Sequence, residues 1–88
     1  MGLFTEINAT SPKSTDAEMK VASYPAGYNI NNTYIIASVL LTTSDSRYKC
    51  QNKNYNIYLK SDGIYMYIDA TAPEDANRPC KLLLFCQH

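Results

Sequence analysis

Few side chains in this 88-residue chain stand at spacings that support catalysis. The only histidine is His88, so we predict no Ser-His-Asp, Cys-His or histidine–metal arrangement within these residues. Glu74 and Asp75 are adjacent, whereas a paired-carboxylate mechanism needs two acids about 5 to 9.5 Å apart across a cleft. The three glycines are isolated from one another, which argues against a phosphate-binding loop. We therefore expect neither an enzyme nor a bound cofactor.

The three cysteines, Cys50, Cys80 and Cys86, are scattered and odd in number. On one strand, Cys80 and Cys86 would be about 20 Å apart at ~3.3 Å per residue, well beyond the ~7 Å that a disulfide bridges. A bridge from Cys50 to either one stays open, but the pattern favours three free thiols in a reduced protein. No Cys-x-x-Cys spacing is present, so no metal site is expected.

The feature that stands above this background is a group of tyrosines around a predicted hairpin. We expect Tyr58, Tyr65 and Tyr67 to project from one face of that hairpin, with Tyr55 and Lys60 nearby. Aromatic rings that carry a hydroxyl are typical of sugar-binding sites and protein interfaces. Cross-strand tyrosine pairs also stabilise ordinary sheets. Three interpretations therefore stay open: sheet or core packing, a subunit interface, and a ligand or receptor surface.

Two polar connections, 44–53 and 70–79, form a second candidate surface. Polar loops held between rigid strands often carry binding residues. An ordinary connecting role is the simpler interpretation of both.

Residues 55–69 are predicted to form the hairpin that positions these tyrosines. The pair Asp62-Gly63 suits a two-residue type I′ turn, which would set Tyr58 opposite Tyr67 and Leu59 opposite Met66. A slip of one residue would mix the polar and apolar side chains of the two faces. In the predicted register one face holds Ile57, Leu59, Met66 and Ile68, and the other holds Tyr58, Lys60, Tyr65 and Tyr67.

Two further strands are predicted from alternating apolar positions. Residues 34–42 form the clearest strand, with every odd position apolar: Ile35, Ala37, Val39 and Leu41. Residues 80–87 form a closing strand, in which one face holds Cys80, Leu82, Leu84 and Cys86.

The N-terminal residues set the predicted domain boundary. Residues 1–17 are polar and rich in turn-forming residues, and we expect a flexible arm or linker there. At 15–23 a short strand is favoured, although Thr15 and Glu18 match a helical capping box. Residues 18–88 would then form a single β domain. About five antiparallel strands and no long helix predict an all-β fold, a small antiparallel β-sandwich or barrel.

Charge and hydropathy exclude two classes of partner. Eight Lys and Arg balance eight Asp and Glu, so the chain lacks the excess positive charge with which proteins bind nucleic acid. No stretch approaches the ~18 consecutive apolar residues of a membrane span, so membrane insertion is not expected. The first residues lack the layout of a secretion signal.

Residues 20–87 resemble a loose family of small C-terminal head domains on bacteriophage tail and tail-fibre proteins. The similar stretches are Tyr24-Pro25-Ala26-Gly27-Tyr28 leading into Asn32-Thr33-Tyr34-Ile35-Ile36, the segment from Tyr58 to Tyr67, and Lys81-Leu82-Leu83-Leu84-Phe85. The resemblance implies a β-sandwich at the distal end of a fibre, often trimeric, on a virion or extracellular surface. It also implies a bacterial surface receptor or glycan as the partner.

Our leading hypothesis is a non-enzymatic attachment or receptor-binding module that uses the tyrosines and the adjoining loops. One alternative is a structural oligomerisation domain of a virion protein, in which the apolar side chains of 34–42 and 80–87 are buried between subunits. Another is a small free-standing protein inhibitor, for which a neutral chain of this size would suffice.

Overall fold

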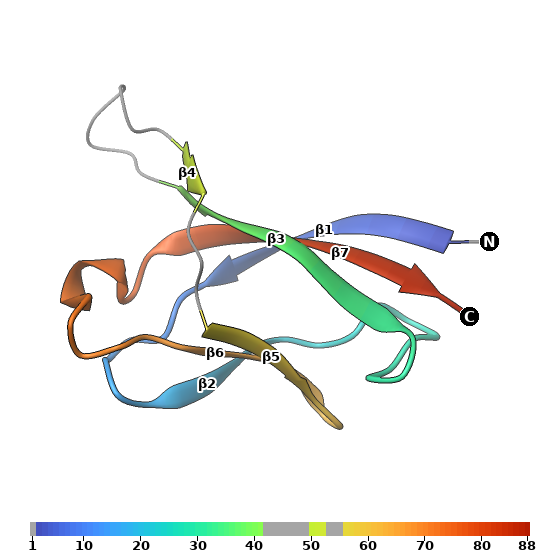
Figure 1. The fold of residues 1–88 in the computed structure, drawn as a ribbon, viewed down its shortest axis with the longest axis horizontal. Helices are drawn as coiled ribbons and strands as arrows, with labels where there is room; N and C mark the ends of the chain where they lie inside the picture. Colours follow the sequence, from blue (N-terminus) through green and yellow to red (C-terminus); the bar gives the residue numbers. More distant parts are fainter. Residues whose placement is uncertain (1, 42–49, 53–55) are drawn as a thin grey trace.

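A computed structural model describes residues 2–41, 50–52 and 56–88, and it has an all-β architecture. The strands are β1 (Gly2–Thr10), β2 (Glu18–Ala22), β3 (Thr33–Leu41), β4 (Cys50–Asn52), β5 (Asn56–Lys60), β6 (Gly63–Tyr67) and β7 (Pro79–Gln87), with a short 3₁₀ turn, η2 (Pro73–Asp75), before β7. One antiparallel sheet has the strand order β1-β7-β3-β4 and the other β2-β6-β5 (Figure 1). The predicted small β-sandwich is confirmed.

The prediction of an arm over residues 1–17 is corrected by β1. This strand pairs with β7 along its whole length, from Gly2 opposite Gln87 to Thr10 opposite Pro79. Its inward side chains, among them Ile7, are partly buried against the core, while the alternating outward ones are exposed. The period-2 pattern was present in the sequence but weak, because the inward positions carry small or polar residues such as Thr5. Pairing with the apolar strand β7 holds this segment in the sheet.

The connection from β1 to β2 is also fixed to the domain, by the buried residues Ser11 and Pro12. The Ser11 amide donates a hydrogen bond to the Arg78 carbonyl oxygen (2.9 Å), and the Asn77 amide donates to the Pro12 carbonyl oxygen (2.8 Å). The Ser11 hydroxyl donates to the Asp75 carbonyl oxygen (2.6 Å) and accepts from the Arg78 amide (2.8 Å). Residues predicted as a linker therefore anchor the turn that leads into β7.

The hairpin of β5 and β6 forms with the predicted faces but a different register. Tyr58 pairs with Tyr65 and Leu59 with Ile64, so the turn residues are Ser61 and Asp62 rather than Asp62 and Gly63. Gly63 instead lies in β6, where an added Cβ would come within 2.8 Å of the Ala22 carbonyl oxygen. Only glycine allows β2 to approach so closely, which places Gly63 in the strand. Because the shift is by two residues, each side chain keeps its predicted face.

β3 confirms the strand predicted at 34–42, but a bulge changes which side chains face inward. The register with β7 shifts between Ile35 and Ala37. Thr33 is therefore buried before the bulge and Ser38 after it, while Ile36 is 48% exposed. The prediction that all odd positions share one face holds only up to the bulge, because an extra residue reverses the alternation.

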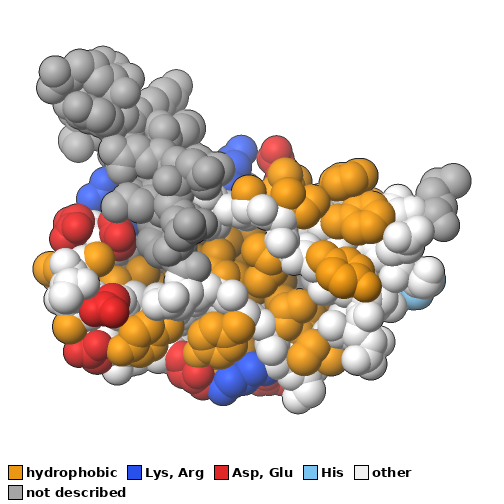
Figure 2. Space-filling view, viewed as in Figure 1, with side chains coloured by type: hydrophobic (Ala, Val, Ile, Leu, Met, Phe, Trp, Pro, Cys, Tyr) orange, Lys and Arg blue, Asp and Glu red, His pale blue; other side chains and the backbone are white. Residues whose placement is uncertain are grey.

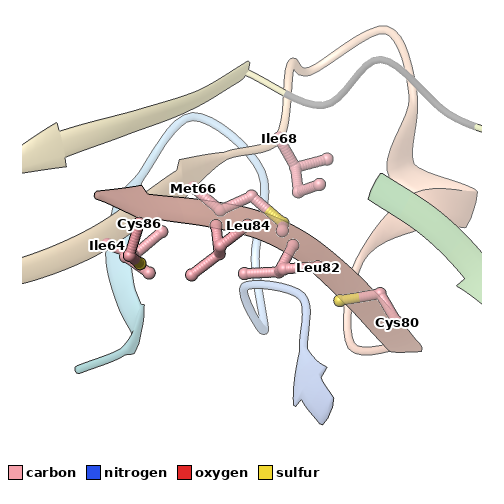
Figure 3. Packing of buried hydrophobic residues seen from close by; sticks show 7 residues of the cluster. All are labelled: Ile64, Met66, Ile68, Cys80, Leu82, Leu84 and Cys86. Atoms are coloured by element: carbon pink, nitrogen blue, oxygen red, sulfur yellow. The ribbon is translucent and has the colours of Figure 1, made fainter. Parts of the chain in front are cut away.

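The core lies between β6 and β7. On β7 the predicted alternation is confirmed, since Cys80, Leu82, Leu84 and Cys86 are buried. They face three apolar side chains from β6 and the residue after it, Ile64, Met66 and Ile68 (Figure 3). Cys80 and Cys86 are free, as predicted, while the Cys50 side chain lies outside what the structure describes.

β2 confirms the strand, rather than the helix, that was favoured at 15–23, and it pairs with β6. Met19 stands opposite Met66 on the core side, and Lys20 stands opposite Tyr65 on the outer side. Asp16, just before the strand, donates its amide hydrogen to the Ile68 carbonyl oxygen (2.8 Å) and extends this pairing. The β2–β6 contact therefore brings the acids at 16 and 18 to the tyrosines of the hairpin.

Candidate binding surface

The outer face of the three-stranded sheet gathers the tyrosines that the sequence singled out. Two rows of side chains run across the strands of this face. One row consists of Lys20, Tyr65 and Tyr58, and the other consists of Glu18, Tyr67 and Asn56. The rings of Tyr58 and Tyr65 stack with centroids 6.1 Å apart and planes 20° from parallel. We call this surface the tyrosine face, defined by Glu18, Lys20, Tyr58, Lys60, Tyr65 and Tyr67.

Glu18 connects two members of the hairpin to β2. It accepts hydrogen bonds from the Lys60 ammonium and from the Tyr58 hydroxyl. The bond from Lys60, followed by that from Tyr58, lowers the pKa of the Glu18 carboxyl below its ordinary value. The same contacts with Glu18 raise the pKa of Lys60 and of Tyr58. At neutral pH this cluster thus holds one carboxylate, one ammonium and one protonated phenol.

Tyr65 is held on both its ring and its hydroxyl. The Lys60 Nζ lies 4.6 Å from the centroid of the Tyr65 ring, within the range of a cation–π contact. The Tyr65 hydroxyl donates a hydrogen bond to Asp62 Oδ2 (2.8 Å) in the hairpin turn. This bond lowers the pKa of Asp62 and raises that of Tyr65.

Tyr67 has an equivalent partner in the connection before β2. Its hydroxyl donates a hydrogen bond to Asp16 Oδ1 (2.7 Å), and this bond raises the pKa of Tyr67. Asp16 has a positive φ of 58°, a conformation that aspartate tolerates better than most residues. The chain bends there and continues directly into β2.

The contacts of the tyrosine face suit recognition better than chemistry. Each of the three hydroxyls donates to a carboxylate of the same chain, so the rings are oriented before any ligand arrives. The rings remain partly exposed, since their strand positions alternate with the buried core positions. Oriented, partly exposed rings offer flat apolar area at a low entropic cost of binding.

The structure brings together four of the five predicted site residues: Tyr58, Tyr65, Tyr67 and Lys60. Tyr55, the fifth, lies outside the described residues, as does most of the candidate loop 44–53. The other candidate loop, 70–79, contains η2 and holds Ser11 through the backbone of Asp75 and Arg78. That contact gives loop 70–79 a structural role.

Three acids of this site were not predicted as partners of the tyrosines. Glu18 was considered as a helix-capping residue and Asp62 as a turn residue, and Asp16 was placed in the arm. The contacts of Glu18 and Asp16 depend on β2 lying beside β6, a pairing that runs from Glu18–Tyr67, 49 residues apart, to Ala22–Ile64, 42 residues apart, and that local patterns do not specify. The signal in the sequence was the alternation of Asp16, Glu18 and Lys20, which puts three charged side chains on one face of a strand.

A second surface, not singled out from the sequence, lies on the outer face of the four-stranded sheet. Phe4, Tyr34 and Ile36 are 69%, 56% and 48% exposed. Phe4 and Phe85 have ring centroids 4.7 Å apart, and those of Tyr34 and Phe85 are 6.5 Å apart. Apolar side chains gather over β1, β3 and β7 in the space-filling view (Figure 2). We call this surface the apolar face, defined by Phe4, Tyr34, Ile36 and Phe85.

Among the described residues, no helix is long and apolar enough to cross a membrane, and no group of three or more His, Cys, Asp or Glu side chains could hold a metal ion. The chain matches no protein-family model, no curated protein and no solved structure.

Proposed function

We propose that this chain is a non-enzymatic attachment domain and that the tyrosine face is its recognition surface. The observation that carries the proposal is the hydrogen bonding of Tyr58, Tyr65 and Tyr67 to carboxylates of their own chain. Sheet packing alone would leave these hydroxyls to water, whereas here each ring has a set orientation. Preorganised aromatic side chains recur at interfaces because little conformational entropy is lost when a partner binds.

A surface glycan is the ligand class that fits this face best. Sugar rings present C–H groups that stack on aromatic rings, and their hydroxyls can donate to carboxylates such as Glu18 and Asp62. The chain has a formal net charge of zero, so it exerts no net long-range attraction on a charged ligand and would bind through short-range contacts. A bacterial surface, reached from the end of a phage fibre, is the setting that the sequence resemblance implies, and we keep it as part of this proposal.

The test is binding of the purified chain to a glycan panel and to intact bacteria. The double variant Tyr65→Ala/Tyr67→Ala should lose at least about tenfold in affinity, as expected when interface aromatics are truncated. The matched control is Tyr34→Ala, which removes an exposed tyrosine from the other sheet. Circular dichroism should show that both variants keep the fold. Unchanged binding by the double variant would overturn the assignment of the site.

Treatment of the cells separates a glycan from a protein receptor. Periodate oxidation of the surface sugars should abolish binding, and protease digestion should leave it intact. The opposite pattern would keep the attachment role but replace the glycan with a protein.

A structural assembly role is the second candidate function, and the exposed side chains of the apolar face favour it. It predicts stable oligomers in solution together with no binding to cells or glycans. Measuring both properties on one preparation separates the two functions.

A further inference from the structure

β1 is the least protected edge among the described strands. It pairs with β7 on one side, and no described strand lies on its other side. It runs for nine residues in unbroken register with β7 and contains neither proline nor lysine. Natural edge strands are usually protected by shortness, a bulge, a lysine or a proline. β1 has none of these devices.

The other described edges do carry such protection. β4 spans three residues, and β2 has a register shift between Lys20 and Ala22. β5 spans five residues and ends in Lys60. The contrast indicates that β1 is the edge suited to pairing with another strand.

A second copy of this chain meets no electrostatic obstacle at β1. Glu6 is the only charged residue of the strand, and the Lys81 Nζ lies 3.6 Å from its carboxylate. The chain as a whole has a formal net charge of zero. Two copies therefore approach without net repulsion, and the Glu6–Lys81 pair stays in solvent when the strands join edge to edge. Face-to-face packing of two apolar sheets would instead bring this ion pair toward the interface, where desolvation is costly.

Among registers centred on Phe4, Thr5 or Glu6, the side chains of β1 favour one. Opposite residues of antiparallel strands share a face of the sheet, so Phe4 stays outward only in registers centred on a residue of β1. A centre at Glu6 places two carboxylates opposite each other, and a centre at Thr5 places Phe4 opposite Glu6. A centre at Phe4 places the two Phe4 rings opposite each other and continues the row of Phe4, Phe85 and Tyr34 into the second copy.

We propose that two copies of this chain pair through antiparallel β1 strands about a two-fold axis at Phe4. The same edge serves both copies, so the contact closes at a dimer, in which residues 2–6 of the two β1 strands pair with each other. This arrangement differs from the trimer that the sequence resemblance implies. It also leaves the tyrosine face of each copy open, because that face belongs to the other sheet.

Sedimentation of the full chain tests the proposal. The wild type should form dimers, and Phe4→Lys or Phe4→Glu should each weaken the dimer at least about tenfold, by placing like charges opposite each other. An equal mixture of these two variants should recover the dimer, since position 4 faces itself across the axis. Ile36→Lys alters the same outer face away from the edge and should still dimerise. A monomeric wild type, or loss of the dimer in Ile36→Lys but not in Phe4→Lys, would overturn the proposal.

Oxidative cross-linking tests the register separately. The wild type is oxidised in parallel, so that cross-links formed by the native cysteines can be subtracted. Phe4→Cys should give a disulfide-linked dimer, because opposite Cβ atoms in a strand pair lie about 4.5 to 5.5 Å apart. Glu6→Cys should give none above that background. Cross-linking of Glu6→Cys in place of Phe4→Cys would move the axis and contradict the register.

Discussion

The rings of Tyr58 and Tyr65 stack across the β5–β6 pair, and their hydroxyls donate to different acids. Tyr58 donates to Glu18 from β2, and Tyr65 to Asp62 from the hairpin turn. One stacked pair is thus held from the edge strand β2 and from the turn of the hairpin. The ligand surface that we propose depends on this support.

Acid should destabilise the domain through Glu18. Lys60 and Tyr58 lower the pKa of the Glu18 carboxyl in the folded state. Its stabilising effect is therefore fully present above the pKa that Glu18 has in the unfolded chain. The effect is lost as the pH falls through the lowered folded value. Urea denaturation over a series of acidic pH values should show stability falling with pH, and Glu18→Gln should flatten that slope. An equal slope in the wild type and Glu18→Gln would contradict the role of this carboxyl.

Alkali should reveal the bond between Tyr67 and Asp16. The pKa of Tyr67 is raised in the folded state, so its contribution to stability is complete below the unfolded pKa and is lost as the pH rises through the folded value. In an absorbance titration of phenolate, Asp16→Asn should move one tyrosine to a lower pH. Tyr67→Phe identifies that tyrosine by removing it. If Asp16→Asn leaves the titration curve unchanged, the hydrogen bond does not exist in solution.

The hairpin register predicts a cost for a side chain at Gly63. Gly63→Ala would bring a Cβ to within 2.8 Å of the Ala22 carbonyl oxygen and should destabilise the domain by about 1 to 3 kcal/mol. Ser61→Ala, in the exposed turn, should stay within about 0.5 kcal/mol of the wild type. Urea denaturation gives both values. A neutral Gly63→Ala would contradict the close approach of the Ala22 carbonyl oxygen to Gly63.

Removing the Ser11 hydroxyl should lower the free energy of unfolding, although Ser11 lies in a connection between two strands. Ser11→Ala would leave the Asp75 carbonyl and the Arg78 amide without their side-chain partner in a buried position, at a cost of about 1 to 3 kcal/mol. Ser14→Ala, at an exposed position of the same connection, is the control and should be neutral. Equal stability of the two variants would mean that the segment is loosely attached.

The sequence patterns predicted the parts of the fold in which local alternation is strong. β7 and the two faces of the hairpin carry clear apolar periods, so the buried set on each could be named in advance. The register of the hairpin could not, because the close approach of Ala22 to Gly63 arises only once β2 is in place. β1 was missed for a related reason, since its strand conformation depends on pairing with β7 at the other end of the chain.

The candidate site, too, could be predicted from the sequence only in part. Tyr58, Lys60, Tyr65 and Tyr67 share a face through local alternation, and their grouping was predicted. Their acidic partners on and before β2 were not, because contacts between distant segments follow from topology. The apolar face escaped prediction because its row joins Phe4, Phe85 and Tyr34 across three strands.

The tyrosine face is tested most directly by mapping backbone amide shifts by NMR while adding polysaccharide extracted from cells that the chain binds. We predict shift changes that concentrate on 56–60 and 63–67 and on the neighbouring 16–20. The strands at 2–10 and 79–87 should change little, since their outer side chains lie on the other sheet. Changes confined to those two strands, or none at a saturating amount of polysaccharide, would contradict the assignment of the tyrosine face as the recognition surface.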